Sequence, residues 1–368
     1  NNYPLEIKVD NSKCKILNDT INVLNSQINI LDSDLSFDGE IHNLFNNILV
    51  DSTKIVHVIG DLISTTFNLK SLISNNDKEN KVVEEYDMPS RFNLDLKTSI
   101  NSLAYNNIYP NQVNCHLIYK DNAVSTKDLR MNLLSGQMLF DGKFYKNTEN
   151  NFKLTGNIKL ENIDVKKTFS AFNNFGQDFI MAKHIKGKSS SSIICNITLN
   201  KFLEIDLDKI NIDSKVSIEK GELIDFKPLE SLSNYVKLDD LAHIKFSKLE
   251  NEIKIKDKII SVPNMEIKSS ALSLIISGKH FFNQEYNYKI SLLLSDLLAK
   301  RFRKKDKEFN NQDSTSLLKT NLQLRMVGDK ENSEISFEKL KIKENLKNEI
   351  KKEILDVKKI ISEEINKK

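Results

Sequence analysis

The stretch from Met265 to Leu298 alternates between apolar and polar residues in two successive runs. Alternate residues of a β-strand point to opposite faces, so each run predicts a strand with one apolar and one polar face. The apolar positions of the two runs are Leu272, Leu274, Ile276, Tyr286, Tyr288, Ile290, Leu292 and Leu294. Together they predict a β-hairpin that is apolar on one side only.

The same alternation recurs along most of the chain. Runs of four to eight residues with a period of two are typical of half-buried strands. The clearest further runs are Phe92-Leu94-Leu96, Val113-Cys115-Leu117-Tyr119, Phe152-Leu154-Ile158-Leu160, Ile193-Cys195-Ile197-Leu199, Ile253-Ile255 and Leu322-Leu324-Met326. Glycine closes five strand-like runs, at Gly136, Gly156, Gly187, Gly278 and Gly328. We expect these glycines to supply the positive φ of turns or bulges, and Asn and Asp to serve the other turns.

Three segments lack this alternation and predict helices. Leu44–Ile63 is mixed, whereas Val165–Met181 clusters four phenylalanines at helical spacing and should plug one end of a core. The tail carries apolar residues at spacings of 4, 4, 3, 4 and 4, namely Leu346, Ile350, Ile354, Val357, Ile361 and Ile365. This is the stripe of an amphipathic helix, which would cap the last strands or bind a partner or a membrane surface.

More than a dozen strands with one apolar face each must bury that face against something. A second sheet would make a sandwich, and a curled sheet would make a groove for an apolar ligand. A membrane barrel is disfavoured because the chain has no Trp for interfacial girdles and ends in a Lys-rich helix. Periodicity alone does not separate the sandwich from the groove.

Composition narrows the function classes. The chain has 54 Lys+Arg against 51 Asp+Glu, so no basic field favours nucleic acid. Its three cysteines and six histidines show no spacing typical of a disulfide framework or a metal site. No nucleophile elbow, phosphate loop or dinucleotide fingerprint is present. We therefore expect no enzyme and no cofactor; a catalytic carboxylate pair would need a polar pocket that the sequence does not indicate.

No apolar run reaches the roughly 18–20 residues that span a bilayer, and no signal-peptide pattern is present. The first residue is Asn. We expect the chain to be a soluble piece of a longer protein whose anchor or export signal lies upstream.

The run from Gly221 to Leu298, GELIDFKPLESLSNYVKLDDLAHIKFSKLENEIKIKDKIISVPNMEIKSSALSLIISGKHFFNQEYNYKISLLLSDLL, resembles the C-terminal region of AsmA-like proteins, especially those of Bacteroidetes. Residues 169–193, FSAFNNFGQDFIMAKHIKGKSSSSI, are similar to the family's segment that joins two groups of strands. The resemblance covers about Arg91 to Lys341. It divides the chain into N-terminal strands and a helix (1–88), an AsmA-like β-groove region (89–338) and a C-terminal amphipathic helix (339–368).

AsmA-like proteins, the relatives of TamB and YhdP, carry an N-terminal inner-membrane helix and a large periplasmic sheet with an apolar interior. The resemblance implies a mainly β fold, an elongated, curled antiparallel sheet that forms an apolar groove with short helices. It also implies a periplasmic location, inner-membrane attachment, phospholipid and envelope proteins as partners, and a role in phospholipid transport and outer-membrane biogenesis. The alternative is an assembly factor that engages outer-membrane proteins through its sheet edges.

An apolar groove suits lipid transport physically. Exposing an acyl chain to water costs about 0.8 kcal/mol per CH₂, and a uniform apolar surface binds without deep sites where a lipid would be trapped. The residues expected to bind lipid are Leu272, Leu274, Ile276, Tyr286, Tyr288, Ile290, Leu292, Leu294, Phe152, Leu154, Ile158, Leu322 and Leu324. They would otherwise form a dry core. If Leu292 lines the groove, Leu292→Asp should block transfer and spare the fold, whereas unfolding would identify Leu292 as core.

Overall fold

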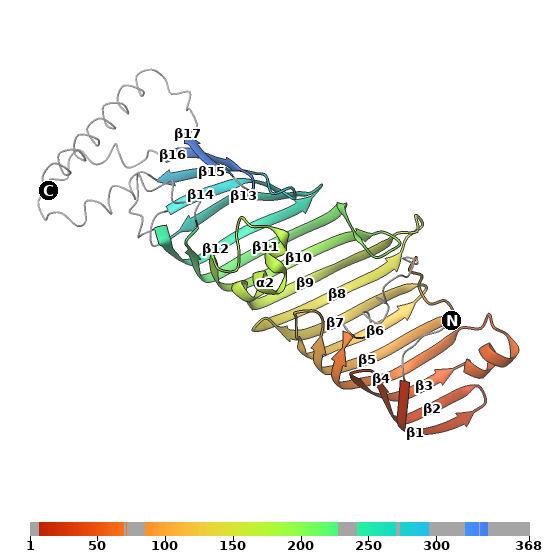
Figure 1. The fold of residues 1–368 in the computed structure, drawn as a ribbon. Helices are drawn as coiled ribbons and strands as arrows, with labels where there is room; N and C mark the ends of the chain where they lie inside the picture. The colour runs from red at the N-terminus through yellow and green to blue at the C-terminus, as the bar shows by residue number, and fades with distance from the viewer. Residues whose placement is uncertain are drawn as a thin grey trace, which may run out of the picture.

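The computed structural model describes residues 7–69, 71, 85–226, 241–269, 273–293, 321–330 and 332–337. Seventeen strands of the described residues form one sheet, in which each strand is hydrogen-bonded to the next along the chain (Figure 1). The strands are β1 (Ile7–Leu17), β2 (Thr20–Ile30), β3 (Ser33–His42), β4 (Val56–Asn68), β5 (Phe92–Ala104), β6 (Asn111–Lys120), β7 (Ala123–Leu133), β8 (Gly136–Lys146), β9 (Phe152–Asp164), β10 (Ile185–Leu199), β11 (Ile205–Ile224), β12 (His243–Lys256), β13 (Ile259–Lys268), β14 (Ser273–Phe281), β15 (Tyr286–Leu293), β16 (Asn321–Gly328) and β17 (Ser333–Phe337).

The sheet is long, curled and open, with β1 and β17 at its two ends (Figure 1). This confirms the expected mainly β fold and excludes the two-sheet sandwich for the described residues. Connections between neighbouring antiparallel strands are mostly tight turns, and Asn and Asp adopt the positive φ that such turns require, as at Asn18, Asp121, Asn122 and Asp257. The amphipathic helix expected at 339–368 lies outside the described residues.

One strand pair departs from the antiparallel pattern. β4 and β5 are parallel, paired from Val56 with Phe92 to Asn68 with Ala104. A parallel pair needs a crossover connection, which returns the chain to the end of the sheet where β4 begins. The expected boundary at residue 88 falls in this crossover, yet the sheet continues through it without a break.

The prediction of a helix at Leu44–Ile63 is wrong for most of that range. Only a short turn of helix, η1 (Asn46–Val50), is present, and β4 begins at Val56. From there Val56, Val58 and Leu62 follow the period of a strand, and Val58 and Leu62 pack against an apolar cluster. Packing against neighbouring strands therefore determines that the chain from Val56 onward forms a strand.

The helix expected at Val165–Met181 is confirmed in its first half. α2 spans Val165–Ala171, and the Asp164 side chain caps it by accepting a hydrogen bond from the Lys167 N–H. A short 3-10 turn, η2 (Asn173–Gly176), follows, and positive φ at Asn174 and Phe175 ends the helical path. The chain then continues as a loop to β10.

At most of these positions, glycine does not supply the positive φ that the sequence pattern predicts. Of the five glycines singled out above, only Gly187 has a positive φ. Gly156 and Gly278 lie inside β9 and β14, where a Cβ would overlap the rings of Phe140 and Tyr288 respectively. These glycines make room for aromatic rings on the same face of the sheet, a known device of curved sheets.

Candidate functional site

A continuous row of apolar side chains crosses the sheet from β1 to β11. Each member is the backbone partner of the next, so all of them lie on one face of the sheet. The row is Ile16, Ile21, Ile41, Val58, Leu94, Tyr119, Val124, Phe144, Leu154, Ile197 and Ile210. We call the side of the sheet that carries this row the apolar face. At about 4.8 Å between neighbouring strands, the row is about 50 Å long.

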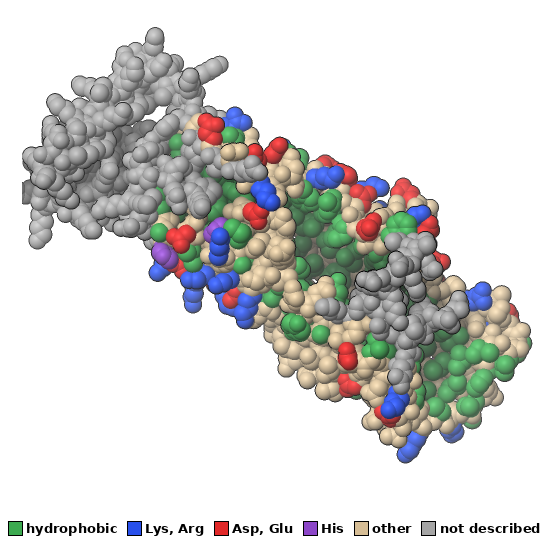
Figure 2. Space-filling model, in the orientation of Figure 1, with side chains coloured by type: hydrophobic (Ala, Val, Ile, Leu, Met, Phe, Trp, Pro, Cys, Tyr) green, Lys and Arg blue, Asp and Glu red, His purple; other side chains and the backbone are tan. Residues whose placement is uncertain are grey.

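Parallel rows widen the apolar face over its middle strands. Positions of β5 to β10 that share this face include Leu96, Leu117, Val113, Leu129, Met131, Met138, Phe140, Ile158, Leu160, Ile193 and Cys195. A charged residue on the same face of β8 is Lys146, at the border of the face, where it pairs with Asp87. Figure 2 shows hydrophobic side chains gathered in a hollow over the middle of the sheet, with charged side chains along its rim.

The opposite face is polar and carries cross-strand ion pairs. Lys215 lies 3.4 Å from Glu252, and Lys254 lies 3.5 Å from Asp213, between the side-chain nitrogen and oxygen atoms. Exposed pairs of this kind contribute little to stability. They keep the outer surface soluble while the other face stays apolar.

The residues expected to bind lipid fall into two groups. In the middle of the sheet, Leu154 and Ile158 lie on the apolar face and are half-buried, while Phe152 is fully buried at its border. At the C-terminal end, Leu274, Ile276, Tyr286, Tyr288, Ile290, Leu292 and Leu324 share one cluster, and Ile290 and Leu292 have no exposed surface. Leu272 and Leu294 lie outside the described residues, and for Leu322 only the backbone pairing with Leu292 is described.

The C-terminal cluster is filled by the chain itself. Phe179, in the loop between η2 and β10, packs on Tyr286 and Tyr288 with ring centroids 4.5 and 5.8 Å apart. Burial raises the pKa of Tyr288 to about 12. We call the loop residues 177–184 the plug. Of the four clustered phenylalanines, Phe179 plugs the core as predicted, whereas Phe172 and Phe175 are 46% and 58% exposed and stack on each other.

Side-chain amides hold the plug in shape. The Gln177 side chain accepts a hydrogen bond from the Ile180 N–H at 2.9 Å and donates one to the Ile180 carbonyl. Asn174 accepts a hydrogen bond from the Ala182 N–H at 2.8 Å. These hydrogen bonds fix the loop that carries Phe179.

A second segment covers the apolar face where β5 begins. Residues 85–91, which end the crossover between β4 and β5, place Met88 against Tyr119 and Phe152. The Tyr119 hydroxyl donates to the Pro89 carbonyl, and the Tyr86 N–H donates to the Lys201 carbonyl at 2.9 Å. We call residues 85–91 the strap. This segment shows no periodic signal, so its position could not be inferred before the structure.

Ion pairs fasten the strap at its sides. Lys146 lies 2.9 Å from Asp87, and Lys201 pairs with Glu85. Hydrogen bonds from these lysines lower the pKa of both carboxyl groups. Between the strap at one side and the plug at the other, side chains of the apolar face such as Leu154 and Ile158 stay half-buried.

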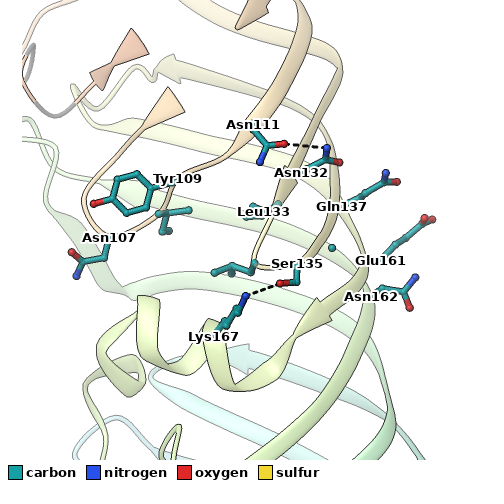
Figure 3. A pocket seen from close by; sticks show the side chains of 13 residues that line it. Asn107, Tyr109, Asn111, Asn132, Leu133, Ser135, Gln137, Glu161, Asn162 and Lys167 are labelled. Carbon is teal, nitrogen blue, oxygen red and sulfur yellow. Dashed lines mark hydrogen bonds between the residues drawn. The ribbon is translucent and has the colours of Figure 1, made fainter. Parts of the chain in front are cut away.

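A polar cavity of about 850 Å³ lies beyond the other ends of β6 to β9 (Figure 3). Its walls are rich in carboxamides, and Asn132 donates to Asn111 at 3.2 Å. Lys167 donates to Ser135 at 2.8 Å. An ammonium group only donates hydrogen bonds, so this contact does not activate Ser135 as a nucleophile.

Other chemistry is sparse in the part of the chain that the structure describes. Burial raises the pKa of the Cys115 and Cys195 thiols, so both stay protonated near neutral pH. No group of three metal-ligating side chains occurs among the described residues. Nor does any helix within the described ranges have the length and apolar character needed to cross a membrane.

The apolar face was partly foreseeable and partly missed. Met138, Phe140 and Phe144 of β8 follow the same period of two as the runs used for prediction and could have been found by it. Comparisons with protein-family models, with curated proteins and with solved structures found no match for this chain. The resemblance to AsmA-like proteins therefore stays a prediction.

Proposed function

We propose that this chain shields the acyl chains of phospholipids on its apolar face and lets them move along the sheet. The observation that carries this proposal is the unbroken apolar row from Ile16 to Ile210, flanked over the middle strands by parallel apolar rows. The charged Lys146, two residues from Phe144, pairs with Asp87 of the strap. The AsmA-like resemblance suggests the setting, a periplasmic protein tethered to the inner membrane that moves phospholipid toward the outer membrane.

The dimensions of the row suit acyl chains. The hydrocarbon core of a bilayer is about 30 Å thick and holds two layers of chains, so one chain needs about 15 Å. The row is about 50 Å long. The strap covers it at Tyr119, so we place acyl chains on the parts to either side and on the parallel rows of the middle strands. Because the apolar surface is uniform and non-directional, a chain can be displaced along it without losing a specific contact.

The middle of the sheet is the part that supports binding best. Leu154 and Ile158 are half-buried there and retain surface for a ligand, whereas Ile290 and Leu292 are completely buried under the chain's own side chains. We therefore propose that lipid contacts β6 to β10 and that the C-terminal cluster stabilises the fold.

A photo-crosslinking experiment tests the proposal. A benzophenone amino acid at position 154 should crosslink to phospholipid, detected by mass spectrometry of the purified protein. The same group at position 194, where Ile194 is 61% exposed on the opposite face, is the matched control. Equal crosslinking at both positions, or none at 154 together with lipid-free protein in native mass spectra, would refute the proposal.

A second candidate function is assembly of outer-membrane proteins by strand addition. It is favoured by β1, an edge strand that is exposed along its whole length and is paired, among the described strands, with β2 along one side. Crosslinking from β1 to a barrel protein, with no lipid bound at position 154, would favour this function over lipid shielding.

A further inference from the structure

The loop between β3 and β4 displays three consecutive aliphatic side chains to solvent. Ile48, Leu49 and Val50 are 66%, 75% and 80% exposed. Figure 1 shows their short helix, η1, standing out from the sheet near its β1 end. Single exposed aliphatics are ordinary, but a projecting group of three marks an interaction site.

The loop is held by its own hydrogen bonds. Asn47 donates to the carbonyls of Ser52 and Lys54, and Asn43 donates to the Ile55 carbonyl at 3.1 Å. At its start, the Asp19 carboxylate accepts hydrogen bonds from the Phe45 and Asn46 N–H groups at 3.0 and 3.1 Å. Arg91 of the strap donates to the Ser52 carbonyl at 2.7 Å. The three aliphatic side chains are thus held outward by a fixed frame.

Apolar surface continues from this loop to the apolar face. Leu44 packs against the cluster of Ile21, Val23, Phe37 and Leu96, which lies on that face. Near the loop, Ile16 and Leu17 of β1 are 56% and 54% exposed. The tip from Leu44 to Val50 carries no charge, whereas its base carries both signs in Asp19, Asp51, Lys54 and Arg91.

We propose that residues 44–55 form a membrane-contact loop, which inserts Ile48, Leu49 and Val50 into the surface of a phospholipid bilayer. An apolar tip above a base of mixed charge matches the boundary between acyl chains and headgroups. A protein partner would need a pocket shaped for three consecutive aliphatic side chains, whereas a bilayer receives them without one. Membrane contact goes beyond the proposed lipid shielding, and either can fail without the other.

The chain contains no Trp, which gives a direct measurement. Leu49→Trp introduces a single fluorescent reporter at the tip, and Ile194→Trp on the polar face is the matched control. On addition of phosphatidylcholine and phosphatidylglycerol vesicles, the emission of the Leu49→Trp variant should move to shorter wavelength and be quenched by brominated acyl chains. The control emission should stay unchanged. If vesicles leave the tip emission unchanged, the proposal is overturned, whatever the crosslinking at position 154 shows.

A second variant measures the contribution of the tip. Leu49→Asp should reduce co-sedimentation with the same vesicles by about tenfold or more. Because Leu49 is exposed, the thermal melting of the variant should match that of the parent chain. Unreduced co-sedimentation would contradict the proposal. An emission shift of the Leu49→Trp variant that rises with protein concentration in the absence of vesicles would instead assign the tip to a second copy of the chain, and would also overturn it.

Discussion

The ring of Phe179 lies against the ring of Tyr286 with 4.5 Å between their centroids, although Tyr286 comes 107 positions later in the sequence. The contact joins the plug to the strands β14 to β16. It means that the hairpin with the clearest apolar stripe is covered by the chain itself. The apolar face therefore has two parts, a self-packed end and a half-exposed middle.

Changing a side chain in each part should separate stability from binding. Leu292→Ala removes a fully buried side chain and should lower the free energy of unfolding by about 2–5 kcal/mol. Leu154→Asp changes a half-buried position and should weaken binding of a fluorescent phospholipid by about tenfold or more while the protein stays folded. Chemical denaturation and lipid titration of both variants check this. If Leu292→Asp keeps the fold and blocks transfer, the C-terminal end is also part of the lipid path.

Acidification should loosen the self-packed end through His280. Its ring lies 5.3 Å from Phe179 and 5.8 Å from Tyr286, and its Nε2 atom has no hydrogen-bond partner among the described residues. Burial lowers the pKa of His280 below its ordinary value near 6.5. The unfolded chain then binds the proton first, so stability is complete above pH 6.5 and is lost as the pH falls toward the folded pKa.

Thermal melts between about pH 7.5 and about pH 5 measure this effect, since the range spans the ordinary histidine pKa. The parent chain should lose melting temperature on acidification, and His280→Leu should remove part of that loss. His116→Gln on the polar face is the control. Because His116 pairs with Asp95 at 2.6 Å, removing it should not lessen the loss. If the melting temperatures of the parent chain and of His280→Leu fall equally with pH, His280 does not cause the loss of stability.

The alternation of apolar residues predicts the strands well because each strand of a curled sheet has one buried and one solvated face. It fails at Leu44–Ile63, where the aliphatic run Ile48-Leu49-Val50 breaks the period before β4 begins. Those side chains are exposed, so no core imposes a period on them. Local pattern also says nothing about which strands are parallel, because the β4–β5 pairing is decided by a crossover of the chain.

The sequence predicts an apolar face but does not locate the part of that face that stays exposed. Period two identified residues such as Leu154 and Leu292 with equal strength, yet one is half-exposed and the other is fully buried. What separates them is cover from segments distant in sequence: Phe179 packs on Tyr286 and Tyr288. Phe226, Leu241 and Ile244 belong to the same buried cluster as Leu292. Coverage by a distant loop leaves no trace in the alternation of the strand that it covers.

Glycine and aromatic residues on the apolar face should be energetically coupled. A Cβ at Gly156 would overlap the ring of Phe140 and would lie 2.7 Å from the Asp141 carbonyl oxygen. Gly156→Ala should therefore cost about 1–3 kcal/mol from overpacking. In the Phe140→Ala background the same substitution should cost at least about 0.5 kcal/mol less, since the ring is gone. Additive effects in urea denaturation would mean that the backbone contact alone excludes a side chain there.

The three thiols should react in an order set by exposure and burial. Cys14 on β1 is exposed, Cys115 is half-buried and Cys195 is buried. Because burial raises the pKa of Cys115 and Cys195, their reactive thiolates form only at higher pH than that of an ordinary thiol. Maleimide near neutral pH should modify Cys14 first, as detected by mass spectrometry. As the pH is raised, the labelling rate of Cys115 should increase before that of Cys195. Cys195 faces the middle of the apolar face opposite Gly156, so its labelling ahead of Cys115 would show that this part of the sheet opens to solvent.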